Sequence, residues 1–537
     1  MMKHLATLLC LLFAFATSAH AQRFLPDDPI LSDDDRIPIP QPARVELSQL
    51  YDFVENTFGD PAAKTAQRAR NINTLGQTPD SSWFTNRIGT RLMTTTEILH
   101  GANSTEGPDT SGKWTIVSAK SEGISPGFRI KDSRGDTYFV KFDPKKYPQL
   151  ATSSEIITSK FFHAFGYNVP EYYLVFITRD QLQIDPEATI SEKGDTKRPM
   201  TERDVDDLLD RVGRLKDGRI PVSASLRLQG EDIGKFKYYG TRSDDANDIF
   251  PHEDRRELRG LRVFSAWLNH DDSRSINTLN MYVPKGDAGY VKHYLIDFGS
   301  TLGSGSVTIQ SHRAGNEYII EKGPILKSGL TFGIWDRPWR YYDYPPYPEI
   351  GRLESAHFEP EKWRPEYPNP AFEKMQNEDA LWATEILMKI TDDIIRAVVA
   401  NGKIQNPQAE QYLGDTLIER KNRILRYYLA RLNPLSGFTA TGNTVKFTNL
   451  GLQAGIASGA SYQYQWFHFN NNQNTTEPAG SILSASAPSI EVPQDDSPYL
   501  MLRIQTVSPA QPNWKKKVDV YIRNGNNKEI VGIEREN

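Results

Sequence analysis

Two short segments of this chain place ionisable and amide side chains directly beside apolar runs. The first is Trp267–Val283 (WLNHDDSRSINTLNMYV) and the second is Leu295–Ser300 (LIDFGS). Asp271, Asp272 and Asp297 would each need a partner to offset the loss of hydration inside a hydrophobic core. The segments are therefore unlike the interior of a hydrophobic core, and we expect them to meet in a site that binds phosphate and metal.

Length and composition bound what such a site can belong to. The chain has 537 residues, too many for one hydrophobic core, so we expect roughly two to three domains. Its net charge of −5 and ordinary aromatic content are typical of a globular protein rather than of a disordered or nucleic-acid-binding chain. We therefore expect no nucleic-acid partner.

Residues 1–21 have the composition of a cleaved signal peptide. Lys3 and His4 precede an apolar run over Leu5–Phe15, and Ala19-His20-Ala21 supplies the small residues that a signal peptidase accepts. A membrane anchor is the alternative, but the run is shorter than the roughly 20 apolar residues that span a bilayer. We expect an exported, periplasmic or extracellular protein without a membrane span in the mature chain.

Cysteine chemistry is excluded if this segment is removed. The only cysteine is Cys10, which lies inside the apolar run. The mature chain would then contain no disulfide, no zinc-thiolate site and no cysteine nucleophile.

Residues 22–110 are expected to form an extended N-terminal arm with short helices. The part up to about residue 43 is rich in Pro and Asp and cannot bury enough apolar surface to fold alone. Short helical patterns occur at Ser48–Phe58 and Thr65–Arg70. We interpret the arm as a preface to the main domain.

Residues 111–230 predict a β-rich lobe. Three β-rich runs separated by Gly, Ser and Asp predict an antiparallel meander: Lys113–Gly123, Gly127–Ser133 and Asp136–Pro144. A helix over Ser153–Tyr167 follows, with Ser153 or Ser154 as its N-cap. Further strands are expected at Glu171–Leu182 and Val222–Gly230, around a polar insertion that contains a helix over Glu202–Leu215.

Lys141 and Glu155 each allow a structural and a functional interpretation. Lys141 lies between Val140 and Phe142, where a lysine on an edge strand would discourage aggregation. Glu155, in the expected first helical turn, would interact favourably with the helix dipole, by roughly 0.3–1 kcal/mol. The functional alternative is an ion pair in which Glu155 orients Lys141 toward a phosphate.

Residues 231–435 predict a helical lobe. The periodicity of His252–Asn269 predicts a helix that leads directly into the loop around Asp271 and Asp272, called the acidic loop below. Strong amphipathic patterns over Ala380–Gly402 and Gln408–Pro434 predict two further helices. Between the first of these helices and the other two, the segment after Gly299 is rich in Gly, Ser, Pro and aromatic residues.

The two opening segments resemble the motifs of protein kinases. His270, Asp272 and Asn277 match the His-x-Asp catalytic loop with its Asn five residues after the Asp, and Asp297-Phe298-Gly299 matches the metal-binding motif. The order of Lys141, Glu155 and these motifs is also the kinase order. The chain is similar in style to divergent branches of the superfamily, namely HipA-like kinases, spore-coat protein H and Fam20-type secretory kinases, over about residues 111–435.

This resemblance implies a role for each matching residue. Asp272 would accept the proton of an attacking hydroxyl, and Arg274 would neutralise charge on the transferred group. Asn277 and Asp297 would hold magnesium or manganese against the phosphates of ATP or another nucleoside triphosphate. Lys141, held by Glu155, would bind the α and β phosphates. Phosphoryl transfer needs charge neutralisation and alignment, which these residue types supply.

The sequence departs from the kinase pattern in several places. There is no G-x-G-x-x-G, and the nearest candidate for a phosphate cover is Ser118–Gly127 (SAKSEGISPG). Asp271 replaces the usual Arg and competes with Asp272 for the role of base, although only Asp272 has the correct spacing to Asn277. Asn280, directly before an apolar strand, is the alternative metal ligand. An Ala-Pro-Glu element is absent.

Two aromatic groups are also open to more than one interpretation. A loop packed on the domain surface is favoured over a substrate or glycan platform for five aromatics that follow Gly299: Trp335, Trp339, Tyr341, Tyr342 and Tyr344. Period-2 runs over residues 436–537 predict an appended all-β sandwich. There, Trp466 is expected in the core, and a glycan contact through Tyr462, Tyr464 and Trp466 is the alternative.

The predicted fold is therefore α+β, a bilobal protein-kinase-like domain followed by a β-sandwich. One functional hypothesis is an exported phosphotransferase that acts on a hydroxyl of an unknown protein or small molecule. The other is a catalytically silent kinase-like binding module, since bulk ATP is scarce outside the bacterial cytoplasm. A glycosidase would need two carboxylates roughly 5–10 Å apart across a cleft, whereas adjacent Asp271 and Asp272 alternate in direction.

Overall fold

The computed structural model describes residues 22–61, 67–119, 125–191, 197–332 and 335–537. The predicted signal peptide lies outside these residues. The chain divides into two compact units: the larger contains residues 31–72 and 78–431, and the smaller combines residues up to 30 with 73–77 and 432–537. Within the described ranges, every helix is too short or too polar to cross a bilayer.

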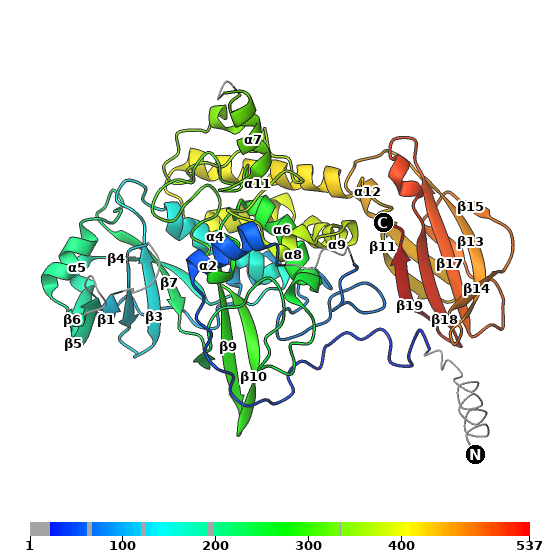
Figure 1. The fold of residues 1–537 in the computed structure, drawn as a ribbon, viewed down its shortest axis with the longest axis horizontal. Helices are drawn as coiled ribbons and strands as arrows, with labels where there is room; N and C mark the ends of the chain where they lie inside the picture. Colours follow the sequence, from blue (N-terminus) through cyan, green and yellow to red (C-terminus); the bar gives the residue numbers. More distant parts are fainter. Residues whose placement is uncertain (1–21, 62–66, 120–124, 192–196, 333–334) are drawn as a thin grey trace, which may run out of the picture. The chain divides into compact units, whose positions relative to one another are not determined.

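A seven-stranded sheet forms the β-rich lobe of the larger unit (Figure 1). Its strands, in the spatial order β4-β7-β3-β2-β1-β5-β6, are β1 (Trp114–Ala119), β2 (Gly127–Lys131), β3 (Thr137–Phe142), β4 (Tyr172–Ile177), β5 (Leu182–Ser191), β6 (Lys197–Pro199) and β7 (Ile220–Leu226). The predicted meander is confirmed, because β1 pairs with β2 and β2 with β3 in antiparallel register. Helix α5 (Glu202–Leu209) packs Val205 and Leu209 into the core of this lobe.

Helix α4 (Leu150–Phe165) joins the sheet to the helical lobe, because it contacts β3, β4 and β7 on one side and α3 (Thr95–His100) and α10 (Asp392–Asn401) on the other. All of its side chains except that of His163 are buried. Phe161 packs edge-on against Trp267, and Phe162 stacks on Phe298 with ring centroids 5.2 Å apart. The helix is therefore a central element of the unit.

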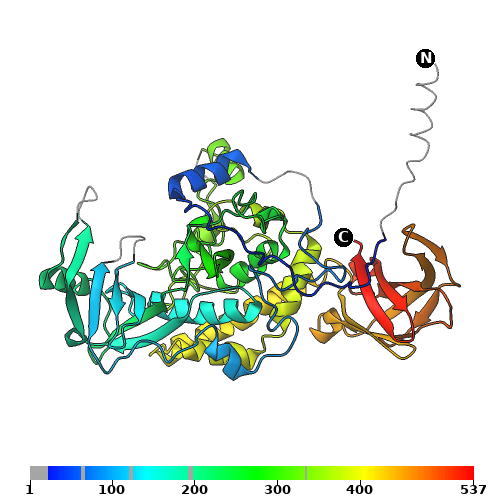
Figure 2. The same ribbon diagram turned by 90° about the horizontal axis from the view of Figure 1, so that it is seen from below.

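The helical lobe surrounds α6 (Arg256–Leu268), the helix that precedes the acidic loop. Its other helices are α3 (Thr95–His100), α8 (Pro370–Glu373), α9 (Asn377–Met388), α10 (Asp392–Asn401) and α11 (Pro407–Tyr428), with α7 (Lys322–Leu330) extending away from them in Figure 1. After α6, the chain forms the hairpin of β9 (Thr278–Lys285) and β10 (Ala288–Leu295), to which β8 (Glu231–Asp232) adds a third strand. Figure 2 shows the same helices from below.

The smaller unit is a β-sandwich. One sheet contains β11 (Leu435–Thr441), β12 (Thr444–Asn449) and β16 (Ser489–Glu491); the other contains β13 (Ser461–Asn470), β14 (Thr475–Pro478), β15 (Leu483–Ala485), β17 (Tyr499–Val507), β18 (Val518–Asn524) and β19 (Lys528–Arg535). Both sheets contribute to one core, in which Trp466 and Tyr462 are buried. The core prediction for Trp466 is confirmed, so neither ring has a face open to a glycan.

Residues 22–30 also belong to this unit. Phe24 is buried among Phe469, Tyr499 and Tyr521, with ring centroids 5.2–6.3 Å away. The guanidinium of Arg23 lies 4.4 Å from the centre of the Tyr521 ring and pairs with Glu534. Residues 22–30 are thus an integral part of the sandwich unit.

The α+β class and the all-β sandwich predicted from the sequence are confirmed, but several elements differ. The helix expected over Thr65–Arg70 is wrong in its described part, since residues 67–70 are not helical. The helical patterning over Ser48–Phe58 is confirmed, since the arm forms α2 (Gln49–Val54), extended by a π-helical turn at Glu55–Gly59. β5 occupies a stretch expected to be a polar insertion, because it pairs in parallel with β1, a partner distant in the sequence.

Candidate active site

Lys141 lies in the middle of the sheet, with its ammonium between two carboxylates. β3 pairs with β2 on one side and β7 on the other, so Lys141 faces Gly127 and Ser223 in the register. Its Nζ donates to Glu155 Oε1 at 2.7 Å and to Asp297 Oδ1 at 2.8 Å. The edge-strand interpretation of Lys141 is therefore wrong.

The Glu155 carboxylate is inside the protein rather than at a helix end. Only 2% of its side chain is exposed, compared with 17% for Lys141 and 33% for Asp297. α4 begins at Leu150, so Glu155 lies beyond its first turn, and neither Ser153 nor Ser154 is the N-cap. The helix-dipole interpretation of Glu155 is thus wrong.

Electrostatics keep Lys141 charged. Burial disfavours the ammonium, but the carboxylates of Asp297 and Glu155 outweigh burial and raise its pKa. A cation held in this way between two acids, with part of its side chain open to solvent, is suited to bind an anionic ligand.

The β9–β10 hairpin brings Asn277 and Asp297 to the same end. Thr278 at the start of β9 pairs with Leu295 at the end of β10, and Ile296 N donates to Asn277 O at 3.0 Å. Asp297 follows with φ of 62°, a left-handed conformation uncommon for residues other than Gly, Asn and Asp. The left-handed turn therefore suits an Asp at this position and directs the chain out of the hairpin just after Ile296.

Asp272 belongs to the same candidate site as the Lys141–Glu155 pair and the Asn277–Asp297 pair. Its carboxylate pairs with Arg274 Nε, and Arg274 Nη1 lies 2.6 Å from Glu366 Oε2. Asn277 Nδ2 donates to Asp272 O at 2.9 Å. Burial raises the pKa of Asp272 to about 7, against the lowering effect of Arg274. A carboxylate with such a pKa is a suitable general base near neutral pH.

Asp271 and Asn280, the sequence alternatives, are engaged elsewhere. Asp271 Oδ1 accepts from Gln310 Nε2 at 2.7 Å, and burial with the nearby Asp272 raises its pKa to about 8. Asn280 Oδ1 contacts His293 Nδ1 at 2.8 Å across the hairpin. The geometry therefore favours Asp272 and Asn277 for the two roles.

His270 and Phe298 are buried and pack against each other next to the acidic loop. Phe298 is fully buried, and its ring centroid lies 6.0 Å from that of His270. Burial lowers the pKa of His270 to about 4, although a hydrogen bond with the backbone of Ser300 opposes that shift. At neutral pH His270 is uncharged and acts as packing beneath the loop.

The oxygen groups here fit a hard divalent cation such as Mg²⁺ or Mn²⁺. Because Asn277 Nδ2 faces Asp272 O, its Oδ1 is the atom left for a metal, next to the partly exposed Asp297 carboxylate. No cluster of three or more His, Cys, Asp or Glu residues suited to a metal occurs in the part of the chain that the structure describes. Magnesium commonly binds through one or two protein oxygens together with substrate phosphates and water, which suits this pair.

A cavity of about 900 Å³ lies beside the sheet and is lined by Ser118, Ser125, Gly127 and Arg129, among others. Its lining does not include Lys141, Asp272 or Asp297. Gly127 is the register partner of Lys141. Part of the candidate phosphate cover, residues 120–124, lies outside the described residues.

The structure adds site residues that the sequence did not reveal. Glu366 is a partner of Arg274, and its backbone N donates to Asp271 O at 2.8 Å. Gln310 connects Asp271 with Asn269, and the Tyr172 hydroxyl accepts from Asp297 N at 3.3 Å. All three belong to segments without a motif, so only the folded chain brings them to the loop.

The aromatic segment after Gly299 divides into two sets. Trp339, Tyr342 and Tyr344 line a cavity of about 390 Å³ in the helical lobe. Tyr342 stacks on His357 with ring centroids 3.9 Å apart. Trp335 does not line this cavity, and Tyr341 is exposed to solvent.

The chain was compared with known proteins. Neither a scan against protein-family models nor a search of curated proteins finds a match. Among solved structures, the proinflammatory kinase CtkA of Helicobacter pylori is 15% identical, with 57% of this chain and 95% of that chain covered and a TM-score of 0.31. The Golgi casein kinase is 10% identical, with 75% and 94% covered and a TM-score of 0.29. Both TM-scores are low, and we infer function from the site residues alone.

Proposed function

We propose that this protein is a kinase-like phosphotransferase, which transfers a phosphoryl group from a metal-bound nucleoside triphosphate, such as ATP, to an acceptor hydroxyl. The main support is the ion-paired set of Lys141, Glu155 and Asp297, at the end of the hairpin that also carries Asn277. A salt bridge with a purely structural role needs only one carboxylate for each ammonium group. A buried lysine that contacts two carboxylates, one of them partly exposed, is better explained by a ligand-binding or catalytic site.

We assign each side chain the role that the kinase resemblance implies. Lys141 binds phosphate oxygens, and Glu155 holds the ammonium in place. Asn277 and Asp297 are the oxygen ligands that would hold magnesium or manganese. When bound, the metal and nucleotide supply the transferable phosphoryl group and neutralise part of its charge.

Asp272 and Arg274 act on the acceptor side. An oxygen of the Asp272 carboxylate accepts the proton of the acceptor hydroxyl, which its pKa of about 7 permits at neutral pH. Arg274 offsets negative charge beside Asp272, and Glu366 fixes the direction of its guanidinium. The proposal covers both protein and small-molecule acceptors, since any hydroxyl meets its chemistry.

Nucleotide binding is the first test. Millimolar ATP with magnesium should raise the melting temperature of the parent protein by a few degrees, as expected for a ligand well above its dissociation constant. Asp297→Ala should abolish the rise. Asp287→Asn is the matched control, because Asp287 is exposed in the turn at the opposite end of the same hairpin and should leave the rise intact.

The second candidate is a catalytically silent kinase-like binding module. It is favoured by the Arg274 contact that already occupies Asp272. A melting temperature that does not respond to nucleotide, together with no consumption of ATP over hours, would support this module and contradict the phosphotransferase.

Export is a separate part of the proposal and rests on residues 1–21 alone. N-terminal sequencing of the secreted or periplasmic protein should find Gln22 as the first residue. An intact Met1 in a cytoplasmic fraction would overturn the proposed location without affecting the proposed chemistry.

A further inference from the structure

Asp143 is a fully buried carboxylate that follows Lys141 by two residues. Its oxygens accept four hydrogen bonds from the start of α4, namely those of Gln149 N (2.8 Å), Ala151 N (2.7 Å), Thr152 N (2.9 Å) and Thr152 Oγ1 (2.6 Å). These backbone N–H groups have no partner within the helix, so a carboxylate satisfies them well. Burial raises the pKa of Asp143 to about 6 against these hydrogen bonds, so the group is ionised at neutral pH.

This cap differs from an ordinary helix cap in its origin. The residue at the N-cap position is Gln149, whose side chain makes no capping hydrogen bond and whose φ is 70°. The capping carboxylate comes instead from the end of strand β3. It therefore ties the strand that carries Lys141 to the helix that carries Glu155.

The same helical turn is also held from the helical lobe. Gln149 Nε2 donates to Lys403 O at 2.6 Å, and Gln149 Oε1 accepts from Gln405 N at 3.0 Å. Ser153 Oγ donates to Gly402 O at 2.8 Å. The start of α4 is thus fixed between β3 and the turn that joins α10 to α11.

We propose that Asp143 is a positioning residue for the Lys141–Glu155 pair. By capping α4 from β3, it fixes Glu155 against Lys141 before any ligand binds, so that α4 need not move to assemble the phosphate-binding cation. The proposal rests on the proposed function for its nucleotide measurement, but not for its measurement on Lys141 itself.

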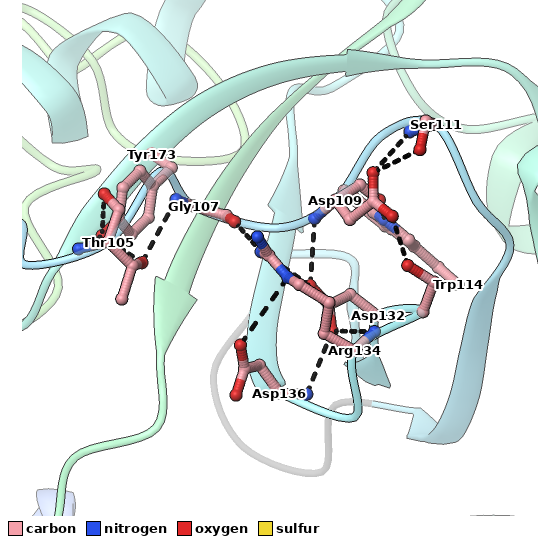
Figure 3. Close-up of polar contacts among 10 residues, drawn as sticks. Thr105, Gly107, Asp109, Ser111, Trp114, Asp132, Arg134, Asp136 and Tyr173 are labelled. Atoms are coloured by element: carbon pink, nitrogen blue, oxygen red, sulfur yellow. Dashed lines mark hydrogen bonds and ion pairs between the residues drawn. The ribbon is translucent and has the colours of Figure 1, made fainter.

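Asp132 supplies a matched control on the same sheet. It is buried in the turn between β2 and β3 and accepts backbone hydrogen bonds from Asp109, Arg134 and Asp136, each at 3.0 Å (Figure 3). It lies before the start of β3, whereas Asp143 follows the end of that strand. Removal of either carboxylate takes the acceptor away from backbone N–H groups, which are buried at Asp143 and partly buried at Asp132, but only the Asp143 carboxylate accepts from the start of α4.

Two measurements would be made on full-length Asp143→Ala, Asp143→Asn and Asp132→Ala. The first is the rate at which trace acetic anhydride acetylates Lys141, followed by mass spectrometry; the second is the dissociation constant of magnesium ATP. Asp143→Ala should accelerate acetylation about five-fold or more and weaken ATP binding about ten-fold, a change typical of one lost cap-strength interaction. Asp143→Asn should lie between, because one acceptor oxygen remains.

Asp132→Ala should lower the melting temperature yet change both quantities by less than about two-fold. The proposal is overturned if folded Asp143→Ala matches Asp132→Ala in both measurements. If Asp143→Ala does not fold, Asp143→Asn decides by the same comparison. If even the parent fails to bind ATP, the proposed function fails, while the acetylation rate still tests Asp143.

Discussion

The two units differ in how much charge they bury. Among the described residues of the smaller unit, Asp28 is the one buried charged side chain, and the other buried polar side chains are neutral, as with Asn433, Asn449 and Thr506. The larger unit buries many charged side chains, among them Glu155 and Asp271 at the candidate site, Asp143 at the start of α4 and Arg256 in α6. Burial of ionised groups opposes stability unless each finds partners. The sandwich therefore depends mainly on apolar packing, whereas the larger unit needs a partner for each of many buried charges.

The largest effect that would sharpen this contrast is expected at Asp272. Asp272→Asn should lower phosphoryl transfer by about 10²–10⁴-fold, because it removes the proton acceptor, and leave the ATP-induced rise in melting temperature nearly unchanged. The measurement is ATP consumption together with the melting temperature. Equal activity in Asp272→Asn and the Asp287→Asn control would exclude Asp272 as the base.

A packing mutation in the sandwich should show the opposite pattern. Trp466→Ala removes a buried ring from a core of apolar side chains and should destabilise the smaller unit by about 3–5 kcal/mol. The ATP-induced shift of the larger unit should persist. Chemical denaturation followed by domain-specific probes tests this, and loss of the ATP response would show that the units are not separate in function.

Burial of His270 makes the larger unit sensitive to acid. Its pKa of about 4 in the folded state lies below the usual 6.5, so the unfolded chain binds more protons between these values, and stability is lost as the pH falls from 6.5 to 4. Relative to His270→Asn, the parent should lose about 2 kcal/mol more between pH 7 and pH 5. Equal losses in urea titrations at the two pH values would contradict this account.

The smallest effect is expected from a surface ion pair of the sandwich. Arg503 pairs with Asp519 at 2.6 Å, and a third of the Arg503 side chain is exposed. Asp519→Asn should change stability by no more than about 1 kcal/mol. A larger loss in the same urea titration would mean that the sandwich also depends on charge, which would weaken the comparison with the larger unit.

The sequence predicted those features that depend on local pattern. The β1–β3 meander, the helix before the acidic loop and the motifs around Asp272 and Asp297 all follow from periodicity or spacing within one stretch. Lys141 could be selected as a candidate, but not placed, since an edge and a central strand have the same alternation. Its two neighbouring strands are known only from the folded sheet.

What the sequence did not predict comes from contacts between distant segments. The start of α4 was expected at Ser153 or Ser154, but Asp143 caps the helix from a strand, so the helix begins earlier at Leu150. Glu366 and Gln310 lie in irregular segments whose residue types carry no signal. Such long-range contacts have no local signature, because a single Asp, Glu or Gln in a loop is more often solvated.

The insertion of Phe24 among Phe469, Tyr499 and Tyr521 has a consequence for synthesis. A ribosome completes the segment around Phe24 long before the strands that receive it, which begin after Leu432. The sandwich can therefore close only after translation of the whole larger unit. Until then an aromatic and a basic side chain are left available to a chaperone, and a chain truncated before the sandwich would keep them unburied.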